Sequence, residues 1–575
     1  MYIESIPNRS SPPCTLLRES YRVEGKVKKR TIANLTKWPP ELIEGLRSLL
    51  RGGTMVENLP ESFDIVRSLP HGHVAAVMGT LRRIGLDRVI GARDTRQHAL
   101  AMAMIVARVI EPQSKLATAR GLGDETAFSS LGEMLGVERA DEDELYDAMD
   151  WLGARQENID KKLAARHLPN GSLVLYDVTS TYFEGRSCPL ASVGHNRDGK
   201  KGKLSIIFGL LCTTEGVPVA VEVFSGNTGD PSTLGAQIGR VRQRFALERV
   251  IFVGDRGMIT DARIRQELRP VEGLEWISAL RAPQIRKLVN NGSLQLSVFD
   301  EQDLAEITDP GFPGERLVVC RNPMLAQQRA RKREELLKAT EGELDKIVKA
   351  TERPKRRLKG KDKIAMRVGK VVNKYKMAKH FHVAIREDDF SYQCKEASVA
   401  KEAALDGIYV IRTSIASEVM SSSRTVAAYK DLSHVERAFR SYKSIDLKVR
   451  PIHHRREDRV RAHVFLCMLA YYVEWHMRRA LAPILFDDDD ALTATAQRRS
   501  IVAPAQRSAS ALRKARRKRT DDGYPVHSFR TLLQDLATVC KNRIQPRLPG
   551  AVPFEKVTFR TSLQQRAFDL LRIKL

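Results

Sequence analysis

The chain has 575 residues, too many for one hydrophobic core, and 42% of them are hydrophobic, which excludes a largely disordered protein. It carries 96 Lys and Arg against 70 Asp and Glu, a formal net charge of +26. Such an excess of positive charge is typical of a protein with a polyanionic partner. The seven cysteines are scattered without a CxxC pair, which argues against a zinc site or a disulfide framework.

No segment predicts export or membrane anchoring. The first residues have neither the basic nor the apolar region of a signal peptide, and the longest apolar run, 464–475, is too short to span a bilayer. We therefore expect a cytoplasmic protein that has no contact with a membrane.

The beginning of the chain predicts a small basic hairpin followed by helices. Residues 20–36 read as two short strands around Glu24 and Gly25. From 39 to 168 the apolar residues recur at three- and four-residue spacing, which is typical of helices. We expect residues 1–168 to form this hairpin and an α-helical N-terminal region.

Strands replace helices in the next segment. The expected order is three strands, a helix, a strand, a helix and a strand, with the strands at 173–183, 203–213, 217–226, 249–257 and 275–280. This order predicts an α/β fold with a mixed sheet that has helices on its faces. We assign residues 169–280 to the first part of a catalytic core.

Residues 281–415 are expected to form a domain inserted into the sheet fold. A charged helical middle is followed by a basic run at 353–379, with twelve Lys or Arg against one acid, and strand-like pieces flank both. Helices resume in 416–480, the expected second part of the core. The last segment, 481–575, is a basic C-terminal region with nine basic and no acidic residues between 497 and 519.

Two aspartates stand where apolar residues are expected. Asp177 continues the apolar run 173–176, and Asp255 ends the buried strand in the stretch 249–257. A carboxylate there needs a partner, because removing an unpaired charge from water costs several kcal/mol. Ordinary alternatives exist: Asp177 could form a salt bridge or end a strand, and Asp255 could cap a helix or stabilise a turn.

A third carboxylate lies on an expected helix at 429–454. Leu432, Val435, Phe439 and Tyr442 form an apolar stripe, and Glu436 lies on the adjoining polar face with Arg440 and Lys443. A surface helix with salt bridges would show the same pattern. If the stripe packs on the sheet, Glu436 lies near the edge that carries the two aspartates.

Two aspartates on strands and a glutamate on a packed helix suit one kind of chemistry. Hard oxygen ligands hold Mg²⁺ or Mn²⁺ and leave coordination positions open for water and phosphate. Two such ions can activate a nucleophile and stabilise a leaving oxygen, while basic residues bind the phosphate backbone. This is the chemistry of nucleases and polynucleotidyl transferases.

The order of these motifs resembles the DDE transposases of bacterial insertion sequences, in the IS-four-type superfamily. That group has a Y-x2-R-x3-E-x6-K signature around its glutamate, and Tyr429, Glu436 and Lys443 fall at those spacings. Leu432 stands where the signature has Arg, so Arg437 or Arg440 would have to take its role. The sequence motif "YKxLxxVExAFRxxK" is similar to that of the IS-sixteen-thirty-four subgroup. "YDVTSTYF", "DRGM", "HNRDGKKGK" and "DGYPVHSFRTLL" add to the resemblance.

The resemblance implies an RNase H-like core in which Asp177, Asp255 and Glu436 bind two Mg²⁺ or Mn²⁺ ions. The reaction it implies is cleavage at the terminal inverted repeats of double-stranded DNA, then joining of the 3′-OH ends to target DNA by a homodimer at the nucleoid. Residues implied to contact DNA are Tyr429, Arg437, Arg440, Lys443, His195, Asn196, Arg197 and Lys200. For the four residues at 195–200, a solvated loop is an equal alternative.

Three alternatives remain open at this point. The protein could be a metal-dependent nuclease without strand transfer, or a catalytically silent DNA-binding protein descended from a transposase. A structural interpretation, with three unrelated salt bridges in a basic scaffold, is the least favoured, because both aspartates fall on strands.

Overall fold

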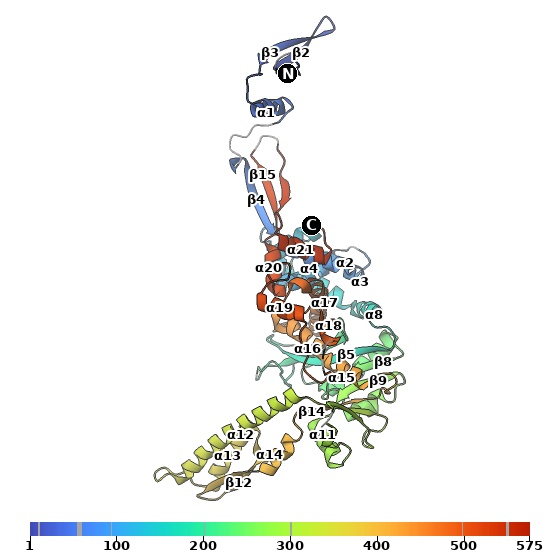
Figure 1. Cartoon of the computed structure of the whole chain (residues 1–575), viewed down its shortest axis with the longest axis vertical. Helices are drawn as coiled ribbons and strands as arrows, with labels where there is room; N and C mark the ends of the chain where they lie inside the picture. Colours follow the sequence, from blue (N-terminus) through green and yellow to red (C-terminus); the bar gives the residue numbers. More distant parts are fainter. Residues whose placement is uncertain are drawn as a thin grey trace. The chain divides into compact units, whose positions relative to one another are not determined.

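The structure is a computed structural model that describes residues 1–9, 12–53, 60–93, 95–200, 202–299, 302–496, 498, 500–547 and 551–575 (Figure 1). The chain divides into two compact units, 1–69 with 540–558, and 70–539 with 559–575. All seven cysteines are free thiols. None of the helices in these described ranges combines the length and apolar character that crossing a membrane requires.

The first unit is built mainly from strands. Its elements are β1 (Tyr2–Ile6), β2 (Cys14–Val23), β3 (Lys26–Asn34), α1 (Pro40–Leu50), the 3₁₀ turn η1 (Pro60–Ser62), β4 (Phe63–Pro70), β15 (Cys540–Pro546) and β16 (Phe554–Val557). The expected basic hairpin is confirmed, since β2 and β3 pair antiparallel. The turn residues Glu24 and Gly25 both have positive φ, as a tight hairpin turn requires.

The prediction of helices throughout 39–168 is wrong at β4. This strand forms a three-stranded sheet with β15 and β16, in the order β16-β15-β4. The partner strands come from the far end of the chain, and a local pattern of apolar residues cannot indicate a pairing over such a separation.

Helices make up one part of the second unit. They are α2 (Gly72–Arg83), α3 (Leu86–Ile90), α4 (Arg96–Ile110), α5 (Lys115–Leu122), α6 (Leu131–Leu135), α7 (Glu142–Gly153), α8 (Gln156–His167), α17 (Glu457–Leu481), α20 (Phe529–Ala537) and α21 (Ser562–Leu571). The apolar run at 464–475 lies in α17, which packs against α2, α4, α7, α21 and a strand of the main sheet. From Ala462 to Glu474 every residue of α17 is buried, so this run is a core helix.

An eight-stranded mixed sheet, in the order β10-β11-β14-β9-β8-β5-β6-β7, forms the rest of the core. Its strands are β5 (Ser172–Tyr182), β6 (Ser205–Thr213), β7 (Pro218–Ser225), β8 (Val250–Val253), β9 (Leu274–Ala279), β10 (Leu304–Ile307), β11 (Arg316–Arg321) and β14 (Ile408–Thr413). β5, β6 and β7 form an antiparallel meander, and β8 and β9 run parallel to β5. The predicted strand order and mixed sheet are confirmed.

Short helices connect these strands. They are η2 (Asp230–Thr233), α9 (Leu234–Gly239), the π-helical turn η3 (Arg240–Arg244), α10 (Asp261–Arg263), the π-helical turn η4 (Ile264–Leu268), α11 (Ala282–Asn290) and η5 (Leu296–Phe299). The first three lie between β7 and β8, and the next two between β8 and β9, which gives the crossovers that parallel strands need.

Residues between β11 and β14 build a separate cluster. Its elements are α12 (Pro323–Glu352), α13 (Lys361–Tyr375), η6 (Ala378–His380), β12 (Phe381–Ile385), β13 (Phe390–Cys394) and α14 (Glu396–Ala403), visible in Figure 1. Leu344, Ile364, Phe381 and Phe390 belong to a hydrophobic core of its own. We call α12 to α14 the insert; β10, β11 and β14, which lie in the same part of the sequence, extend the main sheet.

The chain then returns to the sheet through α15 (Ser422–Lys430), α16 (Leu432–Arg440) and the π-helical turn η7 (Ser441–Ile445). The predicted helix at 429–454 is therefore too long at its C-terminal end. Lys448 has positive φ and Pro451 cannot donate a backbone hydrogen bond, so neither continues a helix. The remaining elements are η8 (Ala482–Ile484), α18 (Ala491–Ala496) and α19 (Ala509–Arg517).

Packing of α16 on the sheet can be tested by truncating Phe439, a buried side chain against Phe208 of β6. We expect Phe439→Ala to lower the free energy of unfolding by about 3–5 kcal/mol, because it removes a buried ring and leaves a cavity. Denaturant unfolding of the two proteins measures this. Val419→Ala, at a side chain that is 64% exposed, should change it by less than about 0.5 kcal/mol. Equal effects would contradict this packing.

Candidate active site

Asp177 and the turn residue Asp255 lie at the same level of two neighbouring strands. β5 and β8 are parallel, and their last paired residues are Leu175 and Val253. Asp177 is two residues beyond Leu175 within β5, and Asp255 is two residues beyond Val253, just after β8 ends. The register therefore brings Asp255 level with Asp177, whose side chain lies on one face of the sheet.

Helix α16 covers this same face. Thr179 lies opposite Phe208 in the sheet, so Phe208 shares the face of Asp177. The ring centroid of Phe208 is 5.8 Å from that of Phe439 and 5.4 Å from that of Tyr442. The apolar stripe that the sequence predicted on this helix therefore packs on the sheet, although Leu432 at its start is only half-buried.

The direction of α16 sets the level of Glu436. Near its start, Nδ1 of His434 is 2.6 Å from the carbonyl oxygen of Thr214, just beyond the residue that pairs with Val174 of β5. Further along, Phe439 contacts Phe208, which lies opposite Thr179. Glu436 falls between these two contacts, and Asp177 falls between Val174 and Thr179, so the two carboxylates lie at a similar level.

The charges of Asp255 and Glu436 both act on Asp177. The pKa of Asp177 is raised to about 7, mainly by burial and in part by these two negative charges. A hydrogen bond from the Val178 N–H, at 2.8 Å, and the guanidinium of Arg197 act in the opposite direction. The carboxylate that interrupts a buried strand is thus under repulsion from two other acids.

Tyr429 of α15 lies beside the same group. Burial raises the pKa of its hydroxyl to about 12, and Asp255, Asp177 and Glu436 add to this effect, whereas Arg256 lowers the pKa. The tyrosine of the signature is therefore close to all three acids.

Asp255 also has the ordinary role that its sequence allowed. Its Oδ1 accepts hydrogen bonds from the backbone N–H of Gly257, at 2.8 Å, and of Met258, at 2.9 Å. These bonds fix the turn after β8 and hold the carboxylate at the end of the strand. A turn aspartate and a functional aspartate are compatible here.

A divalent cation fits the chemistry of these donors. Three carboxylates supply hard oxygens, and a cation would relieve the repulsion that Asp177 experiences. Within the ranges that the structure describes, no three His, Cys, Asp or Glu side chains are close enough to hold one ion together. The three acids therefore share one electrostatic environment without forming a closed ligand cage.

The loop after β5 contains four of the residues expected to contact DNA. Arg197 forms an ion pair with Asp230 and donates to the carbonyl oxygen of Val178, so its guanidinium is held beside Asp177. Asn196 donates to the carbonyl oxygen of Lys200 at 3.0 Å, and the Lys200 ammonium lies 5.9 Å from the ring centroid of Tyr182. His195 is exposed.

Lys443 is also held by protein contacts. Its ammonium lies 3.1 Å from Asp198, which forms a second ion pair with Arg450. Asp198 is 2% exposed and additionally accepts from the backbone N–H of Tyr182. Sequence reasoning missed this aspartate, although a single acid within the basic "HNRDGKKGK" was a usable signal.

Arg437 and Arg440 are exposed on α16. Either of them as a substitute for the Arg of the signature stays a prediction. The arginine whose charge acts on Asp177 is Arg197.

Comparisons with known proteins identify the family of the chain. Residues 170–473, more than half of the chain, match the model of the transposase DDE domain family, and residues 4–58 match the N-terminal domain of IS1634 family transposases. The chain therefore belongs to the transposase DDE domain family. Within it, the chain is a DDE transposase of the IS1634 group, as the resemblance indicated.

The chain is similar to one solved structure, the cryo-EM structure of a piggyBac transposase synaptic complex with hairpin DNA, at 10% sequence identity. The aligned part covers 70% of this chain and 72% of the piggyBac chain. Its TM-score of 0.32 is too low to establish a shared fold. No curated protein sequence matches the chain.

The burial of Asp177 predicts a pH-dependent stability in the absence of metal. Near pH 4 the unfolded chain, whose carboxyl has its ordinary pKa, begins to release this proton, whereas the folded chain keeps it until the pH approaches 7. Stability from this group is therefore lost as the pH rises toward 7. Asp177→Asn removes this loss, so in EDTA the variant should unfold at a higher temperature than the wild type at pH 8.

The gain in stability should reach at most about 4 kcal/mol, at about 1.4 kcal/mol per pH unit, and should shrink toward pH 4. Thermal unfolding at several pH values measures it, with Asp522→Asn at an exposed turn as the control. A variant that is no more stable than the wild type at pH 8 would show that ionisation of Asp177 does not destabilise the folded chain.

Proposed function

We propose that this protein is the transposase of an insertion sequence, which cuts phosphodiester bonds at the terminal inverted repeats and joins the 3′-OH ends to target DNA. The observation that carries the proposal is that Asp177 on β5 and Asp255 just after the parallel strand β8 are at one level, with Glu436 on the helix that covers the face of Asp177. Family membership supports a polynucleotidyl transferase or endonuclease activity.

The proposed core is RNase H-like. Strands β7, β6, β5, β8 and β9 are adjacent in that order, with β6 alone antiparallel to both of its neighbours, and this supports such a core. We place the core in 169–280 and 416–480, the insertion domain in 281–415, the DNA-end binding region in 1–168 and a basic backbone-binding region in 481–575.

Asp177, Asp255 and Glu436 would hold two Mg²⁺ or Mn²⁺ ions. When bound, such ions activate the attacking water or 3′-OH and stabilise the leaving oxygen. The protein side chains fix the site: the Asp255 turn and the packed α16 hold two carboxylates in place, and Arg197 stands beside Asp177. Tyr429, Lys443, Arg437, Arg440 and the loop residues His195, Asn196 and Lys200 are proposed to contact the DNA ends.

The proposed partners follow from the reaction. The substrates are double-stranded DNA at the element ends and at the target, and a homodimer would hold two ends in one complex. Such a protein works where the DNA lies, in the cytoplasm at the nucleoid.

Substitution of the three acids tests the function. Asp177→Asn, Asp255→Asn and Glu436→Gln should each reduce cleavage and joining by more than about 100-fold, because an amide keeps the shape but loses the charge that binds metal. DNA binding should remain. The assay uses labelled DNA with the inverted repeats read from either side of the gene, purified protein and Mg²⁺ or Mn²⁺.

Glu418→Gln, at an exposed carboxylate outside the site, is the matched control and should cut and join at the wild-type rate. Cutting without joining by the wild-type protein would indicate a nuclease instead. Binding without cutting under both metals would indicate a silent descendant, and a Glu436→Gln variant that cuts normally would remove this residue from the site.

A further inference from the structure

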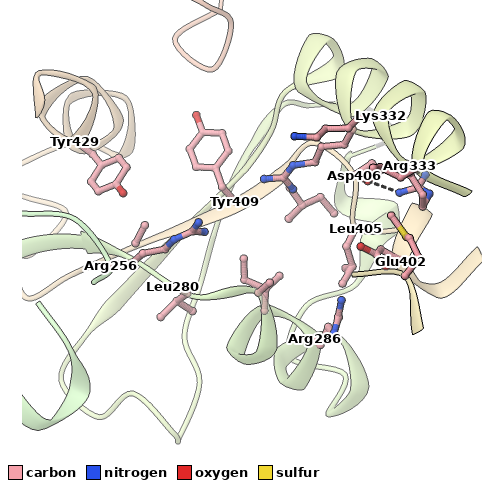
Figure 2. Close-up of a pocket in the computed structure, with 17 residues that line it drawn as sticks. Arg256, Leu280, Arg286, Lys332, Arg333, Glu402, Leu405, Asp406, Tyr409 and Tyr429 are labelled. Carbon is pink, nitrogen blue, oxygen red and sulfur yellow. Dashed lines mark hydrogen bonds and ion pairs between the residues drawn. The ribbon is translucent and has the colours of Figure 1, made fainter. Parts of the chain in front are cut away.

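A pocket with a cationic rim opens beside Tyr429. The cavity has a volume of about 460 Å³ and lies between the strand ends of the main sheet and the insert. Figure 2 shows Lys332 and Arg333 on helix α12 at one side, Arg256 and Tyr429 at the other, and Tyr409 between them. Two parts of the sequence that are far apart thus face one space.

Four cations of this pocket have no protein counter-charge. Arg256, Arg286, Arg329 and Lys332 are exposed and form no ion pair within the part of the chain that the structure describes. They come from the turn after β8, from α11 and from α12. Since like charges repel, their convergence favours an anion between them.

The two acids that line the pocket do not supply this anion. Asp406 binds Arg333 through two hydrogen bonds, of 2.9 and 2.6 Å. Glu402 forms an ion pair with Lys379, at 2.5 Å, and its carboxylate lies 2.7 Å from Nε2 of His380. Both carboxylates are already neutralised by other cations, so the charge of the four cations remains uncompensated.

The pocket adjoins the candidate active site. Tyr429 lines it and also lies in the field of Asp177, Asp255 and Glu436. Arg256 directly follows Asp255 in the chain. A phosphodiester chain that reaches the three acids would therefore have further phosphates within reach of the pocket.

The floor of the pocket is apolar, with Leu280, Ile285, Leu405 and Ile408 among its lining residues. An apolar floor and a cationic rim suit a ligand that has apolar and anionic parts, which describes a DNA strand better than a free inorganic anion.

We propose that Arg286, Arg329 and Lys332, together with Arg256, bind the phosphates of one DNA strand next to the three carboxylates. The insert thereby becomes one wall of the substrate site. This inference rests on the proposed function for the identity of its ligand, and it adds residues of α11 and α12 that no motif in the sequence indicated.

The test compares two double variants of α12 that lose the same charge. Arg329→Ala with Lys332→Ala removes two pocket cations. Arg331→Ala with Lys338→Ala removes two cations that pair with Glu335 and Glu334 on the same helix, outside the pocket. Affinity for a labelled single strand carrying one inverted repeat is measured at several salt concentrations.

We expect the pocket variant to bind more weakly and to lower the slope of log affinity against log salt by about 1.4, at about 0.7 for each phosphate contact of a single strand. The control variant should keep the wild-type slope. Unfolding curves of both variants confirm that each is folded, since all four positions are exposed.

Equal slopes for the pocket variant and the control would overturn the proposal. Cleavage by the wild-type protein is measured in the same preparations, which keeps the two hypotheses apart. If the wild type cuts DNA and the slopes are equal, the pocket assignment fails alone. If the pocket variant has the lower slope expected of it but the wild type does not cut DNA, the proposed function fails and the pocket assignment stands.

Discussion

The parallel pairing of β5 with β8 is the contact on which the candidate site depends. It ends at Leu175 and Val253, and this register alone brings Asp177 and Asp255 to one level. A shift of one residue in β5 would turn Asp177 to the opposite face of the sheet, because side chains alternate along a strand. The core residues on both strands, such as Val174 and Phe252, are fully buried and fix this register.

The third carboxylate, Glu436, is separated from the two aspartates by a long segment of the chain. After β9 the chain builds β10 and β11, leaves the sheet for the insert and returns as β14, which pairs antiparallel with β9. Only then do α15 and α16 cross to the face of Asp177. The insert leaves the sheet after β11 and returns to it at β14, and these two strands pair antiparallel. Its two ends are therefore held close together, and its interior is a separate hydrophobic core.

Much of the core could be predicted from the sequence, because its elements are signalled locally. The apolar run before Asp177, the buried strand before Asp255 and the stripe of Val435, Phe439 and Tyr442 each follow from short-range periodicity. The sheet of β4, β15 and β16 could not be predicted, since it joins segments from the two ends of the chain. The same limit applies to Asp198, whose partners Lys443 and Arg450 are distant in sequence.

Net charge predicted a polyanionic partner but could not say which basic residues face it. The structure separates them by their partners. Arg197 and Lys443 are held by Asp230 and Asp198, and the guanidinium of Arg197 is fixed beside Asp177. The proposed contact of Lys443 with the DNA end would therefore be made by an ammonium that Asp198 already holds in place.

The opposite holds for the cations around the pocket. Arg329 and Lys332 have no carboxylate partner among the described residues, whereas Arg331, Arg333 and Lys338 on the same helix each have one. Surface ion pairs are worth little in water, so this difference does not arise from a need for stability. An uncompensated cluster that shares a pocket with Tyr429, a neighbour of the three acids, is better explained by a substrate that carries its own negative charge along its length.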